Sequence, residues 1–285
     1  MRVPVLTYHS LNVHGRDYGN NDHIAFRDDL AMLCKNGWHI APLFEVVSAY
    51  LGMSPALPKK SVAITFDDGS DFDFHDLAHP EFGVQRSMFN IMCDQISSSK
   101  SVANPHAGAH TKRHPKPHAT SFVIVSPNAR AQLDKACILG KDWWRESWWN
   151  DAVSSGLMSI ANHSWDHNHD CVTPVAVRAQ TKGNFRCIES IEDADAEIRA
   201  GAEYLHGAVP NPGTQFFAYP YGEANDYLIH EDLPAQIANP FVLAAFGTQG
   251  GAVTETSNRW HLPRYVCGFH WKTPDAFAEL LRDAA

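Results

Sequence analysis

The sequence predicts an α/β fold in which the strands form a parallel sheet, closed or open. Short apolar runs alternate with amphipathic stretches along much of the 285 residues, a pattern typical of repeated strand–helix–strand units. Polar clusters directly follow three of the expected strands. Because the carboxyl ends of parallel strands meet at one edge of a sheet, we expect the chemistry to lie there.

The expected strands are short runs rich in Val, Ile, Leu, Thr and aromatic residues, which favour extended backbone. In chain order they are VPVLTY (3–8), a short strand at His39, SVAITF (61–66), ATSFVIV (119–125), MSIANH (158–163), TQFFAYP (214–220), FVLAAF (241–246) and RWHLPRYV (259–266).

Amphipathic stretches between these runs predict the helices. Residues 25–38 carry apolar side chains at positions 26, 30, 33 and 34, and Gly37 marks the end of that helix. One helix is expected after the strand at His39 and another before the strand at 158–163. Residues 191–207 have acidic residues early and a glycine at the end, as amphipathic helices commonly do.

Composition excludes some classes of function. The chain is 44% hydrophobic and 19% charged, with a formal net charge of −9 and no long basic run. Binding to nucleic acid or to an anionic membrane through general electrostatics is therefore not expected. The short basic, proline-containing stretch at 110–118 is interpreted as a solvated loop.

The N-terminal residues read as a strand and show no leader in which a charged segment precedes a long apolar one. No run approaches the roughly 18 apolar residues of a membrane-spanning helix, so a cytoplasmic location without a membrane span is expected. The six cysteines form no CxxC pair and are expected to be free thiols. They are Cys34, Cys93, Cys137, Cys171, Cys187 and Cys267.

Carboxylates and histidines follow two of the strands. Asp67 and Asp68 end the buried run at 61–66, where an unpaired carboxylate would be costly. His163 and His167 are four residues apart and can present both rings to one metal if the segment turns helically. A carboxylate with two imidazoles leaves metal positions open, and the second aspartate then remains free as a base.

These motifs, in this order, resemble those of the polysaccharide deacetylases with a NodB homology domain, carbohydrate esterase family 4. The matching stretches are TFDDG (65–69), HSWDH (163–167) and AYPYG (218–222). The resemblance implies a distorted (β/α)7 barrel that binds a divalent metal, usually Zn²⁺, with Co²⁺, Ni²⁺ or Mn²⁺ as alternatives.

The resemblance also implies roles for individual residues. Asp67 corresponds to the general base, and Asp68, His163 and His167 correspond to the metal ligands. The backbone N–H of Tyr221 would help to hold the oxyanion.

One departure from the family pattern concerns an arginine that normally contacts the base. Ala218 stands at that position of the third motif. The later segment HLPRYV supplies Arg264, which we expect to take over this contact, although a surface arginine near a strand end is an equally good interpretation.

The second departure concerns the general acid. Most members of the family end with a strand of pattern L-x-L-x-H, and none follows AYPYG here. The N-terminal VLTYH places Val5, Thr7 and His9 on one face of a strand. The simplest interpretation is a circular permutation, as in the poly-N-acetylglucosamine deacetylases, with His9 as the acid rather than a histidine satisfied by packing.

Other residues remain open as partners or substitutes of His9. His261 and His270 are weaker candidates for the acid. A carboxylate is expected near His9 to keep it cationic, and the candidates are Asp17, Asp22 and Asp166.

Two stretches lie outside the motifs. Residues 71–118 are expected to form a long irregular insertion within a single domain of residues 1–285. In this insertion the aromatic part at 71–90 is expected to pack over the site, and the part at 97–118 to be mobile. The four tryptophans of 142–149 suit a sugar ring, or form a packed shelf under a loop.

The sequence therefore predicts a metal-dependent hydrolase that removes the N-acetyl group from an N-acetylated sugar or polysaccharide and releases acetate. An alternative keeps the site but takes a small substrate, such as a cyclic amide, a ureide or a formylated sugar. A third hypothesis is an inactive sugar-binding module. The oligomeric state is left open.

Overall fold

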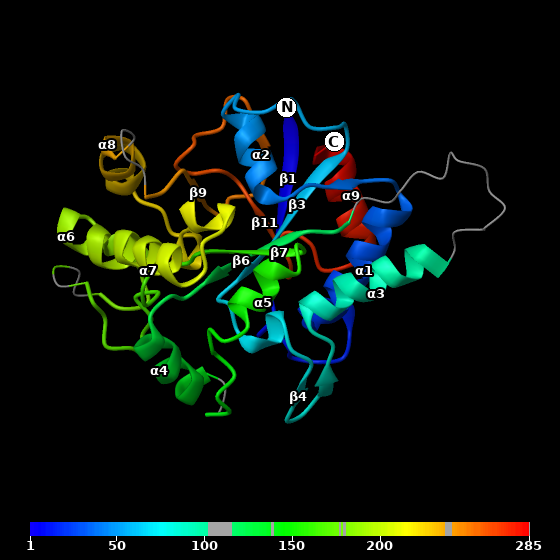
Figure 1. The fold of residues 1–285 in the computed structure, drawn as a ribbon, viewed down its shortest axis with the longest axis horizontal. Coiled ribbons are helices and arrows are strands. Elements are labelled where there is room, and N and C mark those ends of the chain that lie inside the picture. The colour runs from blue at the N-terminus through cyan, green and yellow to red at the C-terminus, as the bar shows by residue number, and fades with distance from the viewer. Residues whose placement is uncertain (102–115, 138–139, 177, 179–180, 237–240, 285) are drawn as a thin grey trace.

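A computed structural model describes residues 1–101, 116–137, 140–176, 178, 181–236 and 241–284 (Figure 1). Six strands pair in parallel, each with the next in the sheet. In that order they are β1 (Arg2–His9), β3 (Ser61–Asp67), β6 (Ala119–Val123), β7 (Met158–Asn162), β8 (Phe216–Ala218) and β9 (Ala244–Phe246).

The segment 262–266 closes this row of strands into a ring. Leu262 forms a parallel bridge with Phe246 of β9, and β11 (Tyr265–Val266) pairs in parallel with β1. The ring thus has seven parallel members, and the expected distorted (β/α)7 barrel is confirmed. Strand β1 lies between β3 and the last segment, the place that a transferred terminal strand would take.

Smaller elements extend the sheet and surround it. Strand β10 (Ala252–Thr254) pairs antiparallel with β1, and β2 (His39–Ile40) pairs in parallel with β3. The helices are α1 (Asp22–Lys35), α2 (Leu43–Tyr50), α3 (Met88–Ser101), α4 (Pro127–Cys137), α5 (Trp149–Ser154), α6 (Ile191–Ala194), α7 (Ala200–Ala208), α8 (Leu233–Ala235) and α9 (Pro274–Ala284).

Register and side-chain alternation set the edge of the barrel that carries the polar residues. The pairing of β1 with β3 runs from Val5↔Ala63 to His9↔Asp67. Val5 and Ala63 belong to a buried apolar cluster with Phe122 of β6. Because side chains alternate along a strand, this face of β3 continues to Asp67 at the carboxyl end. The apolar face of the barrel thus ends in a carboxylate.

The two ends of the described chain are close in space. The Arg2 guanidinium donates a hydrogen bond to the carbonyl of Asp283 in α9 at 2.6 Å, and Figure 1 shows both ends on one side of the barrel.

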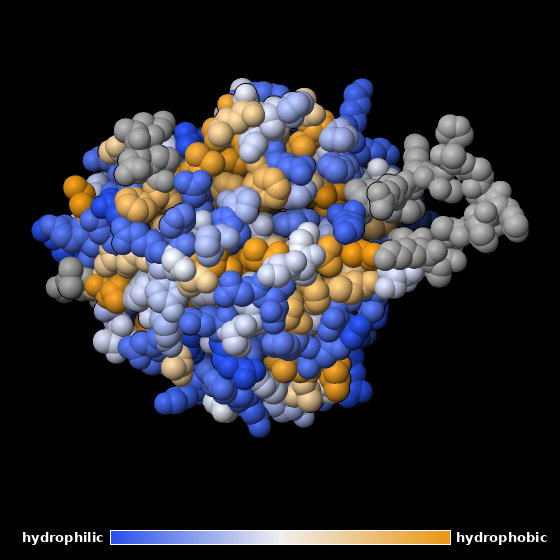
Figure 2. All heavy atoms as spheres, viewed as in Figure 1, coloured by the Kyte–Doolittle hydropathy of each residue, from blue (hydrophilic) through white to orange (hydrophobic). Residues whose placement is uncertain are grey.

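On the face drawn in Figure 2, hydrophilic residues cover much of the surface and apolar residues appear in several separate groups between them. No helix of the described residues is long and apolar enough to span a membrane.

The irregular insertion predicted for 71–118 is wrong for most of its described part. Strands β4 (Leu77–His79) and β5 (Gly83–Gln85) form a hairpin that projects from the body in Figure 1, and α3 follows it. Met88, Ile91 and Met92 are buried at helical spacing, a pattern that the surrounding polar residues obscure. Of the part expected to be mobile, residues 102–115 lie outside the described residues.

Other elements also differ from prediction. The last predicted strand, 259–266, is regular strand only at Tyr265–Val266, because Pro263 lacks the N–H that a continuous ladder requires. Helices α4 and α9 lie where no element was predicted. All six cysteines are free, as expected.

Candidate active site

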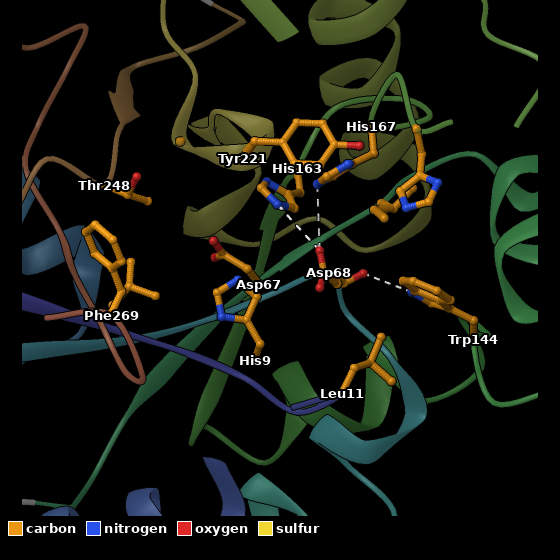
Figure 3. A pocket seen from close by; sticks show the side chains of 14 residues that line it. His9, Leu11, Asp67, Asp68, Trp144, His163, His167, Tyr221, Thr248 and Phe269 are labelled. Atoms are coloured by element: carbon orange, nitrogen blue, oxygen red, sulfur yellow. Dashed lines mark hydrogen bonds and ion pairs between the residues drawn. The ribbon is translucent and has the colours of Figure 1, made fainter. Parts of the chain in front are cut away.

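A pocket of about 480 Å³ opens at the carboxyl ends of the barrel strands (Figure 3). All the sequence-predicted site residues except Arg264 line it. They are His9, Asp67, Asp68, His163, His167 and Tyr221. Arg264 is fully buried and contacts Asp67 instead. The neighbours in this pocket therefore come from strands that are far apart in the sequence.

The Asp67–Asp68–Gly69 turn depends on close contact with β6. Asp68 and Gly69 both have φ of +73°, and a Cβ on Gly69 would lie 2.4 Å from the Val123 side chain. Glycine is therefore required at that position. The Trp144 indole N–H donates a hydrogen bond to the Asp68 carbonyl at 2.9 Å. The strained Asp68 backbone is thus held from two sides.

Asp67 is held by a buried arginine. Arg264 donates two hydrogen bonds to its carboxylate, Nη1 to Oδ1 at 2.7 Å and Nη2 to Oδ2 at 2.8 Å. Burial alone would raise the pKa of Asp67, but Arg264 and then His163 lower it to about 2. The interpretation of Arg264 as a surface residue is wrong: its guanidinium makes the contact expected of the arginine missing at Ala218.

Asp68, His163 and His167 converge on one point. Asp68 Oδ1 lies 3.7 Å from His163 Nε2 and 3.8 Å from His167 Nε2, and the three ligand atoms lie within 4.8 Å of one another. His163 Nδ1 donates to the Ala218 carbonyl at 2.8 Å, because a carbonyl can only accept. Its Nε2 therefore faces the pocket without a proton.

Burial favours the neutral form of both imidazoles. It lowers the pKa of His163, and it lowers the pKa of His167 further, helped by the neighbouring His163. Neutral imidazole nitrogens and a carboxylate oxygen are ligands for a divalent metal. The donor set and the orientation of His163 fit such an ion.

A buried glutamate that was not predicted supports the loop after β7. The Glu197 carbonyl accepts from the Trp165 N–H at 2.7 Å, and its carboxyl group accepts from the Asp166 N–H at 3.3 Å. Glu197 lies in a π-helical turn (Asp195–Arg199), a feature frequent near functional sites. Burial, then Asp166, raises its pKa. The amphipathic pattern of residues 191–207 predicts a helix but does not indicate that Glu197 supports the loop after β7.

His9 lies beside Asp67 at the end of the neighbouring strand (Figure 3). Asp22, one of the three predicted carboxylates, accepts a hydrogen bond at Oδ2 from the backbone N–H of His9 at 2.8 Å. Asp166 accepts from the N–H groups of Asn168 and Val175 instead, and Asp17 precedes the short helix Tyr18–Asn20. Among the described residues, His9 Nδ1 is buried without a hydrogen-bond partner.

The other histidines proposed as the acid lie elsewhere. Neither His261 nor His270 is among the described residues that line the pocket. His270 Nδ1 accepts from the Val266 N–H at 2.8 Å, and burial lowers the pKa of both rings.

The AYPYG turn brings Tyr221 to the side of the pocket that carries His167. Tyr221 has a φ of +59°, and its ring packs edge-on against His167 at a centroid distance of 4.4 Å. A Cβ on Gly222 would lie 1.8 Å from Thr248 Oγ1. This close approach explains the glycine of the motif.

The tryptophan-rich stretch is mainly structural. Trp148 and Trp149 are buried in the main core, and Trp143 packs on Phe72. Of these four tryptophans, only Trp144 lines the pocket.

The insertion predicted at 71–118 does not cover the pocket as expected, because none of its described residues lines it. Phe74, for example, stacks on Trp148.

A comparison with models of protein families tests the family resemblance that the motifs predict. The family model for polysaccharide deacetylase matches residues 113–237. The resemblance inferred from the motifs is thereby confirmed. The matched stretch contains the second and third motifs but not the first, nor His9 or Arg264. No curated protein matches.

Solved structures share the fold. IcaB from Ammonifex degensii is 20% identical with a TM-score of 0.61, over 99% of this chain and 97% of that one. The deacetylase PplD from Streptococcus pyogenes, in complex with acetate, is 19% identical with a TM-score of 0.61, over 99% and 98%. A de-N-acetylase from Aggregatibacter actinomycetemcomitans is 17% identical with a TM-score of 0.61, over 98% and 100%.

Proposed function

We propose that this chain is a metal-dependent carbohydrate deacetylase, which hydrolyses the acetamide of an N-acetylated sugar or polysaccharide to acetate and a free amine. The family match and the shared fold support this activity. The main observation that supports it is that two adjacent aspartates have different surroundings. Asp68 faces two imidazoles, whereas Asp67 is paired with Arg264 and stays ionised beside them.

The proposed metal is Zn²⁺, held by Asp68, His163 and His167, because two imidazoles and one carboxylate are a common catalytic zinc set. The bound ion would polarise the acetamide carbonyl and acidify the attacking water. Co²⁺, Ni²⁺ and Mn²⁺ remain alternatives for the same donors.

The side chains around the ion then have separate tasks. Asp67 accepts the proton of the attacking water, and Arg264 keeps its carboxylate ionised and oriented. The backbone N–H of Tyr221 donates to the oxyanion. His9 lies beside Asp67 and protonates the departing amine.

A direct assay tests the activity. Purified chain loaded with Zn²⁺ is incubated with N-acetylglucosamine oligomers of increasing length, and acetate and new primary amines are measured together. We expect both products in equal amounts, and none with Asp67→Asn. Turnover of a cyclic amide, a ureide or a formylated sugar without any acetate from the oligomers would instead favour the small-substrate alternative.

The inactive sugar-binding module is disfavoured by Asp67. A binding protein has no need of a buried, ionised carboxylate that a buried arginine holds at the edge of a metal-ligand set. Binding of the oligomers without acetate release under any of the four metals would nevertheless support it.

A further inference from the structure

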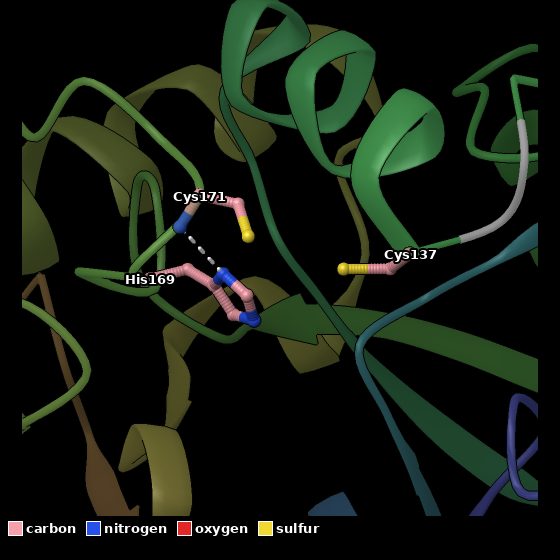
Figure 4. Close-up of side chains that lie close together, drawn as sticks. All are labelled: Cys137, His169 and Cys171. Carbon is pink, nitrogen blue, oxygen red and sulfur yellow. Dashed lines mark hydrogen bonds between the residues drawn. The ribbon is translucent and has the colours of Figure 1, made fainter.

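A second group of metal-ligand side chains borders the pocket and has no part in the proposed reaction. Cys137, His169 and Cys171 each offer one ligand atom, and these atoms all lie within 4.8 Å of one another (Figure 4). Within the described ranges, only this group and the Asp68 group meet that spacing. We propose that Cys137, His169 and Cys171 form a second metal site, which binds a thiophilic divalent cation of the Zn²⁺ type.

Two separate segments of the chain bring these residues together. Cys137 is the last residue of α4, whereas His169 and Cys171 lie in the loop that continues from His167. Figure 4 shows both sulfurs and the imidazole directed toward a common space. The carbonyl groups at the end of α4 carry partial negative charge, which favours a cation there.

The donor chemistry specifies the class of ion. Two thiolates and one imidazole suit zinc and other thiophilic metals, whereas Mg²⁺ and Ca²⁺ require oxygen ligands. Three protein ligands leave a position open for water or a further group. Both cysteines are exposed and His169 is half-buried, so an ion can reach the site without any opening of the fold.

One hydrogen bond must be exchanged for coordination. His169 Nδ1 accepts from the Cys171 backbone N–H at 3.1 Å. Coordination through Nδ1 replaces this bond directly, and coordination through Nε2 moves the ring proton to Nδ1 and also breaks it. A single neutral hydrogen bond is weak beside a metal–thiolate bond. It meanwhile keeps the ring close to the Cys171 backbone.

The imidazole distinguishes a metal site from a simple disulfide. An oxidant such as a small-molecule disulfide could in principle join the two sulfurs, since Cys137 and Cys171 are close. A disulfide would leave His169 without a role, whereas a metal uses all three residues. The experiment below separates the two outcomes.

The second site would also act on the first through their shared loop. His169 lines the same pocket as the proposed catalytic residues, and its ring centroid lies 6.0 Å from that of His167. An ion held by His169 and Cys171 would restrain the loop that carries His167. This inference does not depend on the proposed activity, because metal binding is measured without substrate.

Metal titration of the reduced, metal-free chain tests the proposal, with Co²⁺ as a spectroscopic probe and Zn²⁺ for stoichiometry. We expect two equivalents of Zn²⁺ for the two groups, and a near-ultraviolet thiolate-to-cobalt charge-transfer band. Cys137→Ser and Cys171→Ser should each lose the band and about one equivalent. His163→Ala should lose an equivalent but keep the band.

Cys93→Ser is the matched control, because Cys93 lies in α3 and does not line the pocket; it should keep both the band and the stoichiometry. A wild-type chain without the band would overturn the proposal. So would a band that survives in both Cys137→Ser and Cys171→Ser. Thiol counting and peptide mapping that find Cys137 joined to Cys171, with no metal uptake after reduction, would replace the metal site with a disulfide.

Discussion

The two sides of the pocket are held together in different ways. On one side, Asp67 is paired with Arg264, which is 197 residues away in the sequence. On the other, a backbone group orients one of the three proposed metal ligands, because the Ala218 carbonyl accepts from His163 Nδ1. The base side therefore depends on a buried ion pair, and the metal side on backbone geometry. Substitutions on the Asp67 side should therefore impair turnover, and substitutions on the other side should impair metal binding.

The largest expected effect separates the two aspartates. Asp67→Asn should bind metal normally but show no turnover above background, because an amide cannot accept the proton. Asp68→Asn should lose metal and activity together, because it removes one of the ligand groups. Elemental analysis and the acetate assay on the same samples measure both. Loss of metal in Asp67→Asn with retention in Asp68→Asn would reverse the two assignments.

His9→Ala should lower the rate of amide hydrolysis by about 10²- to 10⁴-fold, the usual contribution of one acid–base group, with full metal content. The loss should be smaller for an activated ester, whose leaving group needs little protonation.

His261→Ala and His270→Ala are the matched controls for His9, since neither residue lines the pocket. Both should keep the wild-type rate. An unchanged amide rate in His9→Ala, with a large loss in either control, would move the acid to that residue and remove the functional argument for a permuted strand.

Much of this arrangement could be predicted from the sequence, because its residues lie in short motifs at strand ends. Asp67, Asp68, His163 and His167 are examples, and strand alternation alone puts His9 on the same face as Val5. Their meeting in one pocket follows from the parallel order of the strands.

What could not be predicted depends on contacts between distant segments. Glu197 is an ordinary acidic residue of a helix until the fold sets it under the loop after β7. The ion pair of Arg264 was proposed only by resemblance, with a surface position equally open. Cys137 comes from a helix that was not predicted, so its approach to His169 and Cys171 left no local signal.

In a pH–rate profile, Arg264→Met should raise the pH below which activity is lost. The pKa of Asp67 is lowered to about 2 from the ordinary 3.8, so its carboxylate stays ionised as the pH falls toward 2. Without the guanidinium, the effect of burial dominates and the pKa rises. We therefore expect the variant to lose activity at mildly acidic pH, where the wild type keeps Asp67 charged.

The same substitution should destabilise the fold by about 3–5 kcal/mol at neutral pH, because it leaves a buried charge without its partner. The loss should shrink as the pH falls and Asp67 becomes protonated. Arg27→Met is the control, because Arg27 pairs only with Asp28 at the exposed surface of the described residues, where such pairs contribute about 0–1 kcal/mol. Urea unfolding at several pH values measures both; equal losses would contradict the buried role of Arg264.

The smallest expected effect is a change in metal affinity at the Asp68, His163 and His167 group. Trp144→Phe keeps an aromatic ring in the pocket wall but removes the indole N–H that donates to the Asp68 carbonyl. One such bond contributes about 0.5–1.5 kcal/mol, so metal affinity should fall by about tenfold or less, with the Asp67 side unaffected. Chelator competition measures this affinity. Trp143→Phe is the control, because Trp143 packs on Phe72 and does not line the pocket. Equal affinities in the two variants would show that the backbone of the Asp68 turn holds its geometry without the indole, and that the metal side needs no support beyond its own motif.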